Sequence, residues 1–301
     1  MGYLRKGISW LFGYGWIARL INHPLIQILF PAITGAYFLV LDIWGEKWEF
    51  ISKNIAFHEK LFVYLLLATL ASQIFITISK IVRKTKDDDY LKFLEGFMVL
   101  TASVVAFKLN RFSRCAPRLK KKSNTFKTIT QPKEQIEYII DQSSKWLKES
   151  FGLHDDQISF TVIKIDGRSN SIFYLFESSN SWKRTRAKDI VSGDTAASYC
   201  LGKGEPIYFP DKSLAAKKGR YFMSERDARR SNGSVYCYPV FVNTPDYKDK
   251  YVISIVTYGK LLSDPRDDEA SKIIKSIFAE LCRRIELELT LATIRAWQFG
   301  E

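Results

Sequence analysis

The sequence predicts two parts of different character: an α-helical transmembrane hairpin near the N-terminus, and a larger α/β domain with an antiparallel sheet flanked by helices. Two long stretches near the N-terminus lack charged residues, and the segments outside them are basic. After residue 130, apolar residues recur with the periods of helices and strands in turn. We expect four segments: an interfacial N-terminal segment (1–23), the hairpin (24–86), a coupling helix with a basic linker (87–129) and the α/β domain (130–301).

The two uncharged stretches are close to the length of membrane spans. No charged residue or histidine occurs from Leu25 to Leu41, which is 17 residues, or from Leu61 to Ser79, which is 19 residues. A helix that rises about 1.5 Å per residue needs about 20 residues to cross the hydrocarbon core. The second run meets this need, and the first meets it with help from Pro24, which suits a first helical turn. Two buried core helices of a soluble protein are the alternative.

The charges beside these runs predict the orientation. Residues 1–23 contain three basic residues and no acid, and residues 80–86 contain four basic residues, whereas the connector 42–60 contains four acids and three bases. By the positive-inside rule, the chain is a multi-pass protein of the cell inner membrane with both termini in the cytoplasm. The aromatic and basic residues of 1–20 predict an interfacial helix, with a disordered tail as the alternative.

A polar stripe in the second run predicts contacts with other helices. Thr69, Gln73 and Thr77 follow one another at four-residue intervals, and Ser72 lies beside them. In lipid, such a face turns toward other helices. We therefore expect a homo-oligomer, a dimer or tetramer, in which the stripe either packs helices together or lines a pore.

The segment after the hairpin predicts a coupling helix and a basic linker. The acidic triplet 87–89 favours a helix N-terminus, and the uncharged stretch 96–107 is 12 residues, too short for an unaided span. We expect a buried or interfacial helix, with a third, irregular membrane segment as the alternative. Residues 108–133 contain nine basic residues and no acid, which suits anionic lipid or a polyanionic ligand. The residues expected to make this contact are Arg118, Lys120, Lys121 and Lys122.

From residue 130 onward the pattern predicts helices and hairpins in a defined order. A helix begins near Pro132 and ends near Gly152. Alternating runs predict one hairpin over 157–179 and a second over 235–259. A short helix (193–203) and the strand IYFPD lie between them, and a long helix follows Asp264-Pro265 and ends near Trp297.

This order resembles that of a GAF domain over roughly residues 130–298. The residues that carry the resemblance are TAASYCLGKGEPIYFPD, VYCYPVFVN, YVISIVTYG and LLSDPRDDEASKIIKSIFAELCRRIELEL. The resemblance implies a central antiparallel sheet flanked by helices, a small-molecule pocket on one sheet face and dimerisation through the first and last helices. The chain lacks the NKFDE-type motif of cyclic-nucleotide GAF domains and a histidine beside a chromophore cysteine, so neither ligand class is carried over.

Two basic segments would cover the pocket that the resemblance implies. Arginine binds phosphate oxygens through two N–H groups, and aromatic rings stack on bases, so the segments predict an anionic nucleotide or oligonucleotide as the ligand. Solvated loops of a basic protein are the alternative. The candidate ligand-binding residues are Trp182, Lys183, Arg184, Arg186, Lys217, Arg220, Tyr221, Arg226, Arg229 and Arg230.

The sequence does not show the pattern of an enzyme or a metal site. Its four cysteines are widely separated and it has three histidines, so zinc or disulfide spacing is not seen. A nucleophile paired with a base and a glycine-rich phosphate loop are also not seen. We expect no catalytic residue, no metal and no cofactor.

The architecture resembles transmembrane effectors of bacterial nucleotide-signalled antiphage defence, in which ligand state controls a pore or membrane disruption. The expected function is that of an oligomeric membrane effector or sensor. Its partners are the lipid bilayer and an anionic nucleotide-like ligand that controls the transmembrane bundle. The alternative is a non-conducting sensor or scaffold that signals through a separate cytoplasmic partner.

Overall fold

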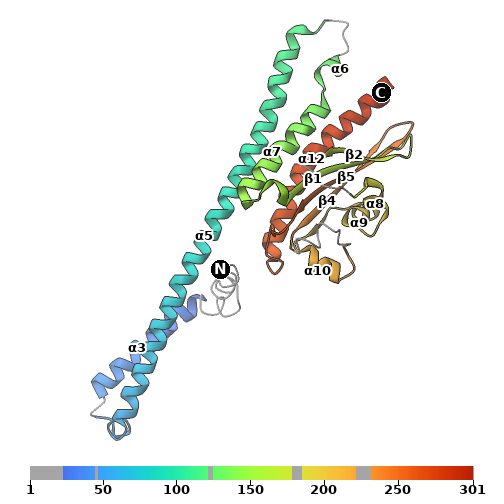
Figure 1. Cartoon of the computed structure of the whole chain (residues 1–301). Helices are drawn as coiled ribbons and strands as arrows, with labels where there is room; N and C mark the ends of the chain where they lie inside the picture. The colour runs from blue at the N-terminus through green and yellow to red at the C-terminus, as the bar shows by residue number, and fades with distance from the viewer. Residues whose placement is uncertain (1–22, 45–46, 121–124, 178–184, 222–231, 301) are drawn as a thin grey trace. The chain divides into compact units, whose positions relative to one another are not determined.

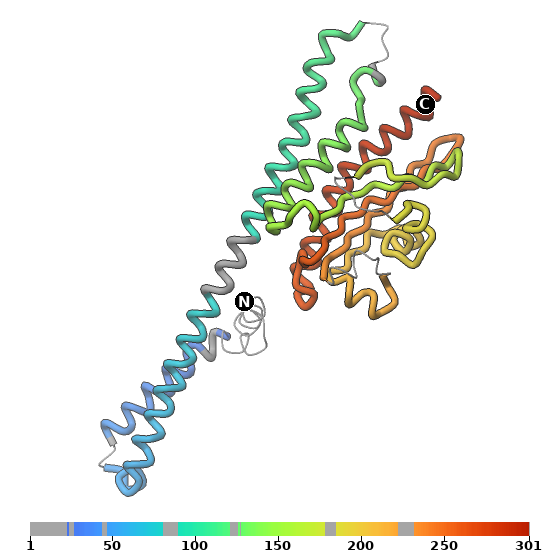
Figure 2. The backbone as a smooth tube through the Cα atoms, in the orientation of Figure 1, coloured from blue at the N-terminus to red at the C-terminus, as the bar shows by residue number. Residues whose placement is uncertain are grey.

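The computed structural model describes residues 23–44, 47–120, 125–177, 185–221 and 232–300 (Figures 1 and 2). The chain divides into two compact units, Met1–Leu94 and Glu95–Glu301. The predicted interfacial helix over 1–20 lies outside the described residues.

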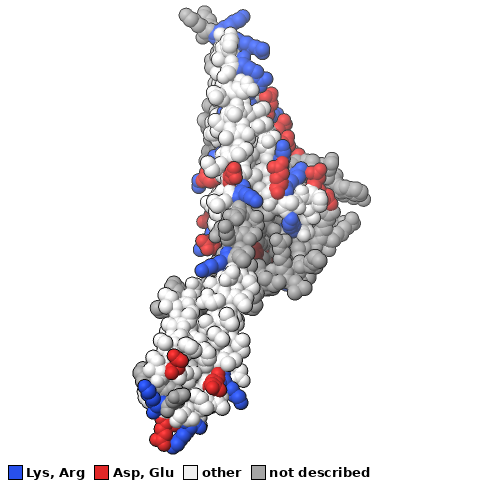
Figure 3. Space-filling model, turned by 90° about the vertical axis from the view of Figure 1, so that its left-hand side faces the viewer, with Lys and Arg blue, Asp and Glu red and all other residues white. Residues whose placement is uncertain are grey.

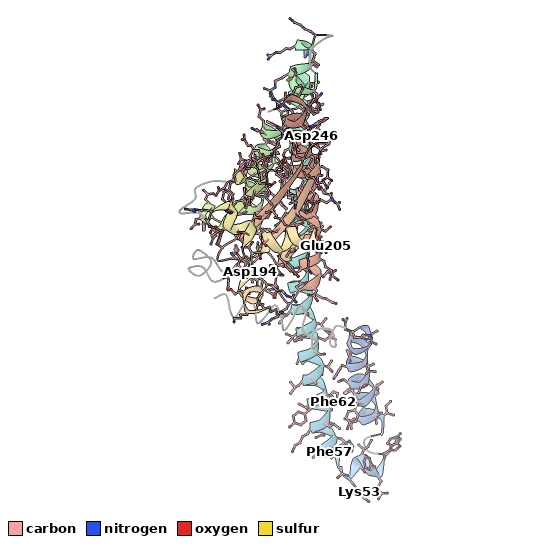
Figure 4. All side chains as sticks on the ribbon, turned by 90° about the vertical axis from the view of Figure 1, so that its right-hand side faces the viewer. Lys53, Phe57, Phe62, Asp194, Glu205 and Asp246 are labelled. Atoms are coloured by element: carbon pink, nitrogen blue, oxygen red, sulfur yellow. The ribbon has the colours of Figure 1, made fainter. Side chains whose placement is uncertain are left out.

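The first unit is a helical hairpin. Its helices are α3 (Pro24–Trp44), the short α4 (Glu49–Ser52) and the N-terminal part of α5 (Ile55–Cys115). The hydroxyls of Thr34 and Thr69 lie 2.8 Å apart, and the rings of Phe38 and Phe62 lie 5.5 Å apart. Figure 4 shows Phe62 on the part of α5 that runs beside α3. These contacts hold α3 against α5.

Two helical stretches are long and apolar enough to cross a membrane. They are Ile55–Lys80, with 26 residues, and Tyr90–Arg118, with 29 residues. The first contains the predicted run 61–79. The second contains the uncharged stretch 96–107, for which a buried or interfacial helix was predicted. In the region of the other predicted span, Gln27–Ile43 is a shorter apolar helix.

The predicted helix start at the acidic triplet 87–89 is wrong. Helix α5 continues through these residues and reaches a length of 61 residues. The segment 80–95 contains neither glycine nor proline, the two residues that most disfavour a helix interior. Acidic residues stabilise a helix N-terminus, but they are also tolerated in the interior of a helix, so they need not mark its start.

The second unit contains a five-stranded antiparallel sheet in the order β2-β1-β5-β4-β3. The strands are β1 (Ile158–Ile165), β2 (Ile172–Glu177), β3 (Ile207–Phe209), β4 (Val235–Asn243) and β5 (Lys248–Thr257). Strands β1 and β2 pair with each other, as do β4 and β5, which confirms both predicted hairpins. Pairing of β1 with β5 joins the two hairpins into one sheet.

Helices cover both faces of this sheet, which confirms the expected mixture of an antiparallel sheet and flanking helices (Figure 1). Tyr251 on β5 contacts Thr293 of α12, whereas the next residue, Val252, packs with Ala197 and Cys200 of α9. Successive strand residues point to opposite faces, so β5 requires cover on both sides. The covering helices are α7 (Pro132–Phe151) and α12 (Asp268–Phe299) on one face, and α8 (Ala187–Ser192) and α9 (Ala196–Lys203) on the other.

Local chemistry sets the ends of the long helices. Pro132 occupies the first turn of α7, and Gly152 ends it in the left-handed conformation at φ 57°. The side chain of Asp267 accepts a hydrogen bond from the backbone N–H of Ala270 and caps α12. The remaining short helices are η2 (Ala116–Arg118), α6 (Thr125–Ile129), η3 (Asp155–Gln157) and α10 (Lys212–Lys217).

The C-terminal part of α5 belongs to the second unit and packs along α7. The rings of Phe107 and Tyr138 stack with centroids 4.0 Å apart. The side-chain amide of Gln135 donates to the backbone oxygen of Val104 at 3.1 Å. One face of the apolar stretch 96–107 is therefore buried against protein.

We predict that Phe278→Ala lowers the stability of the second unit by about 3–5 kcal/mol, because this side chain is fully buried against Tyr236. The exposed Leu287 on the same helix is the matched control, and Leu287→Ala should change stability by less than about 0.5 kcal/mol. Thermal unfolding of the full chain in lipid nanodiscs measures both. Equal effects of the two substitutions would contradict the described burial of α12.

Candidate functional site

The second unit contains a cavity of about 520 Å³ between the α7 and α12 layer and the edge of the sheet. Ligand pockets commonly have volumes of about 300–1,000 Å³, so a nucleotide-sized molecule suits this space. The lining comes from α7 and the residue before it, from β1, β2 and β5, and from the C-terminal part of α12. Its residues are Gln131, Pro132, Lys133, Glu134, Ile136, Lys164, Phe173, Leu175, Phe176, Tyr251, Ala292, Thr293, Arg295 and Ala296.

A β-bulge builds the apolar wall of the cavity. Phe173 pairs with Lys164, and Phe176 pairs with Val162, so the register shifts between these pairs and Leu175 is the extra residue. Regular alternation would turn Phe173 and Phe176, three positions apart, to opposite faces. The extra residue brings them to the same face, where both line the cavity.

A buried polar cluster forms the floor. The ammonium of Lys164 lies 2.8 Å from Asp249 Oδ2 and 3.3 Å from Asp166 Oδ2, and the Asp249 side chain is fully buried. The backbone N–H of Gly167 donates to Asp249 Oδ1 at 2.9 Å, and the hydroxyl of Tyr251 donates to Oδ2 at 3.1 Å. A buried carboxylate needs such partners, and here it has an ion pair and several hydrogen bonds.

Two titrating groups of this cluster have shifted pKa values. Burial raises the pKa of the Asp166 carboxyl, but backbone N–H groups of Arg168 and Ser169 and the Lys164 ammonium outweigh burial, so the pKa lies below its ordinary value. Burial raises the pKa of Tyr251 well above its ordinary range. Its hydroxyl therefore stays protonated and can donate to Asp249, and Thr293 Oγ1 lies 2.6 Å from the same hydroxyl.

Two cations line the cavity besides Lys164. Lys133 is exposed in the first turn of α7, and Arg295 comes from α12 and donates through Nη1 to the backbone oxygen of Thr130 at 3.2 Å. Lys164 is neutralised by its aspartates, and Glu134 is the acidic residue in the lining. The part of the lining that can meet a ligand charge is therefore basic, and its N-terminal α7 position adds a favourable helix dipole.

The cavity is bonded to helix α5. Arg111 donates through Nη1 to the backbone oxygen of Gln131 at 3.0 Å and through Nη2 to Gln135 Oε1 at 3.2 Å. Lys108 forms an ion pair with Glu288, one turn before the lining residue Ala292 on α12. Both helices that close the cavity thus share polar contacts with the C-terminal part of α5.

The predicted ligand-binding residues are only partly described. Arg186, Lys217 and Arg220 are exposed, and Tyr221 is half-buried against the apolar cluster beneath α8 and α9. Tyr221 therefore lies on the sheet face opposite the cavity. The predicted residues that lie outside the described part of the chain are Trp182, Lys183, Arg184, Arg226, Arg229 and Arg230.

Within one chain, the residues of the predicted polar stripe of α5 have different surroundings. Thr69 bonds to Thr34 of α3, whereas Gln73 and Thr77 are exposed. The hydroxyls of Ser72 and Thr77 bond to backbone oxygens of their own helix. Each four-residue step turns the helix face by about 40°, so residues eight positions apart diverge by about 80°.

The remaining predicted contacts are also partly described. Arg118 and Lys120 are exposed beyond the C-terminal end of α5, and Lys121 and Lys122 lie outside the described residues. Within the described ranges, groups of three or more His, Cys, Asp or Glu with metal-site geometry are not found. Burial raises the pKa of the Cys237 thiol to about 12, which gives it the character of a structural, unreactive cysteine.

Sequence reasoning missed the residues that line this cavity, because they come from segments far apart in the chain. One signal was present: Lys164 is the charged residue in the strand ISFTVIKI, whose other residues are uncharged. A charged residue within such a strand implies a buried partner, and the structure identifies that partner as Asp249. Comparison of the sequence with protein-family models and with curated proteins gives no match.

We predict that Lys164→Met destabilises the second unit by about 3–5 kcal/mol, because it leaves the buried Asp249 carboxylate without its cation. Adding Asp249→Asn should recover part of the loss. Lys250→Met, on an exposed neighbouring lysine, is the control and should change stability by less than about 0.5 kcal/mol. Thermal unfolding of the four chains tests this, and a missing recovery in the double variant would contradict the ion pair.

The lowered pKa of Asp166 predicts that the stability of the second unit depends on pH. Its folded pKa lies below its unfolded value, so its stabilisation is present above about pH 4 and is lost as the pH falls further. The stability difference between the natural chain and Asp166→Asn should therefore be full at pH 7 and disappear on acidification. Unfolding measured from pH 7 to pH 2 reports it, and a constant difference would exclude the assigned contacts.

Proposed function

We propose that this chain is a membrane-anchored receptor whose second unit binds a small amphipathic anion, with nucleotide-like molecules as the leading class. The observation that carries this proposal is the cavity, which combines an aromatic wall with cations at its lining. Rings such as Phe173 and Phe176 stack against a base or another flat apolar body. Lys133 and Arg295 supply the charge for a phosphate or carboxylate.

The bound ligand would act on the membrane part through helix α5. Gln131 lines the cavity and is also bonded to Arg111 of α5. A ligand that moves the first turn of α7 therefore changes a direct partner of α5. This is the coupling role expected for this helix from its sequence.

We further propose that the hairpin lies in the inner membrane, with both termini and the GAF-like second unit in the cytoplasm. The apolar stretch Ile55–Lys80 and the basic flanks of the hairpin support this topology. In this proposal the chain forms an oligomer and acts as a ligand-controlled membrane effector, of the kind used in antiphage defence.

A second candidate is a non-conducting sensor or scaffold that signals through a cytoplasmic partner. The Thr34–Thr69 contact supports it, because the two hydroxyls lie 2.8 Å apart between α3 and α5 of the same chain. A pore would have to use the exposed Gln73 and Thr77.

The binding prediction concerns a pair of lysines on α7. Lys133→Glu should weaken nucleotide binding about tenfold or more, because it reverses a charge in the cavity lining. Lys145→Glu reverses another exposed charge on the same helix, 12 positions away, and should leave binding unchanged. Fluorescence polarisation with labelled mononucleotides and cyclic dinucleotides, on the chain in nanodiscs, measures both. Loss of binding in Arg226→Glu but not in Lys133→Glu would move the site to the predicted loops.

The membrane prediction concerns two exposed polar residues of α5. Cells that express the intact chain should depolarise, and the double variant Gln73→Leu with Thr77→Val should not, because it removes the polar groups available to a pore. Ile74→Leu, at an exposed apolar position between them, is the control. A voltage-sensitive dye measures this at matched membrane levels of protein. Unchanged potential in every strain would favour the non-conducting sensor.

A further inference from the structure

The part of α5 within the second unit has two apolar faces, and the described residues of that unit cover one of them. Leu100 and Val104 are buried on the covered side. On the other side Met98 is 70% exposed, Val105 62% and Leu109 63%. Figure 3 shows this side of α5 as a surface that is mostly free of charged residues. An apolar surface of this kind marks an interaction site.

The spacing of the apolar residues on this side, of which Phe112 is half-buried and the others are exposed, indicates what kind of partner fits. Met98, Ala102, Val105, Leu109 and Phe112 follow one another at steps of four, three, four and three residues. A mean repeat of 3.5 is the pattern with which one helix packs its side chains between those of another along a coiled-coil seam. We call these five residues the α5 seam.

A lipid surface fits the α5 seam poorly. The same turns of α5 carry Lys108 and Arg111, which are held by Glu288 and Gln135 of the second unit. The helix α7, packed alongside, exposes several charged residues. They are Lys133, Glu134, Glu137, Asp141 and Lys145. A bilayer against the seam would bring these charges close to hydrocarbon, which is costly.

We infer that a second copy of this chain covers the α5 seam, in a parallel helix pair. The seam is self-complementary, because each copy supplies the same apolar positions. The positions beside it include Thr101, Ala106 and Ser113, which are uncharged, and the charge of Lys108 is compensated by Glu288. Two equal helices therefore meet without strong like-charge repulsion. The parallel direction rests on the proposed membrane anchorage, which gives both copies the same helix direction.

This pairing would let ligand binding in one chain affect the contact between two chains. Arg111 and Lys108 tie the covered face of α5 to the cavity-bearing helices, and the α5 seam lies on the opposite face. A shift of α7 or α12 would rotate or translate the seam. The inference therefore rests on the proposed function and adds that the receptor works as a dimer paired through the α5 seam.

Cysteine cross-linking of the full chain in its membrane tests the inference. The background is Cys115→Ser, because the other three cysteines are buried. In a parallel pair, Met98→Cys and Val105→Cys each face their own counterpart and should form disulfide-linked dimers under mild oxidation. Lys145→Cys, on the exposed face of α7, is the matched control and should give at least tenfold less dimer.

A second pair of variants tests the seam without a cross-link. Val105→Glu with Leu109→Glu should lower the dimer fraction at least tenfold in single-molecule photobleaching in nanodiscs. Lys145→Glu should not change it. Nucleotide binding is measured on the same samples. An unchanged dimer fraction in Val105→Glu with Leu109→Glu overturns this inference, and intact nucleotide binding then leaves the proposed receptor standing.

Three results would overturn the inference. The first is equal or absent cross-linking of Val105→Cys and Lys145→Cys when both react with a maleimide. The second is capture of a photoactivatable lipid at Val105, which would assign the seam to the bilayer. The third is a cross-linked product whose mass is not twice that of the chain, which would assign it to another protein.

Discussion

The second unit depends on one constraint, which is that its central strand is buried on both faces. Residues Tyr251 to Ile255 of β5 are all buried. Water therefore cannot satisfy either face, and helices must cover both, since apolar burial is the main favourable term in folding. Helices α7 and α12 cover one side, and α8 and α9 cover the other. Burial falls from the middle of the sheet to its edges: β5, in the middle, is mostly buried, whereas β2 and β3, at the edges, are mostly half-buried.

The cavity arises where this cover ends. Strand β2 at the edge of the sheet has mostly half-buried residues, and α7 and α12 do not fill the space above it. The bulge at Leu175 then turns both phenylalanines of β2 into that space. The rings of Phe173 and Phe176 leave apolar surface in contact with water, which is unfavourable, and a bound ligand would cover that surface. The buried Asp249–Lys164 pair beneath it stays satisfied whether or not a ligand is present, because its partners are all within the fold.

Helix α5 is one continuous helix that contributes residues to both units. Toward its N-terminus it packs on α3 through Thr69 and Phe62, and toward its C-terminus it packs on α7 through Phe107. Its Arg111 and Lys108 bind groups of α7 and α12, so this part of the helix is a structural element of the second unit.

The sequence by itself determined the apolar run of α5, the two β-hairpins and the ends of α7 and α12. Each depends on residues close together in the chain, such as Pro132 and Gly152 at the ends of one helix, or alternation within a single strand. Only the tertiary structure decided that α5 runs unbroken past its acidic triplet, because a helix end is set by competition between local signals. It also decided that Thr69 faces α3 while Thr77 does not, and that Lys164 meets Asp249 85 positions away. Those outcomes depend on pairing and packing between distant segments, and local residue patterns do not encode them.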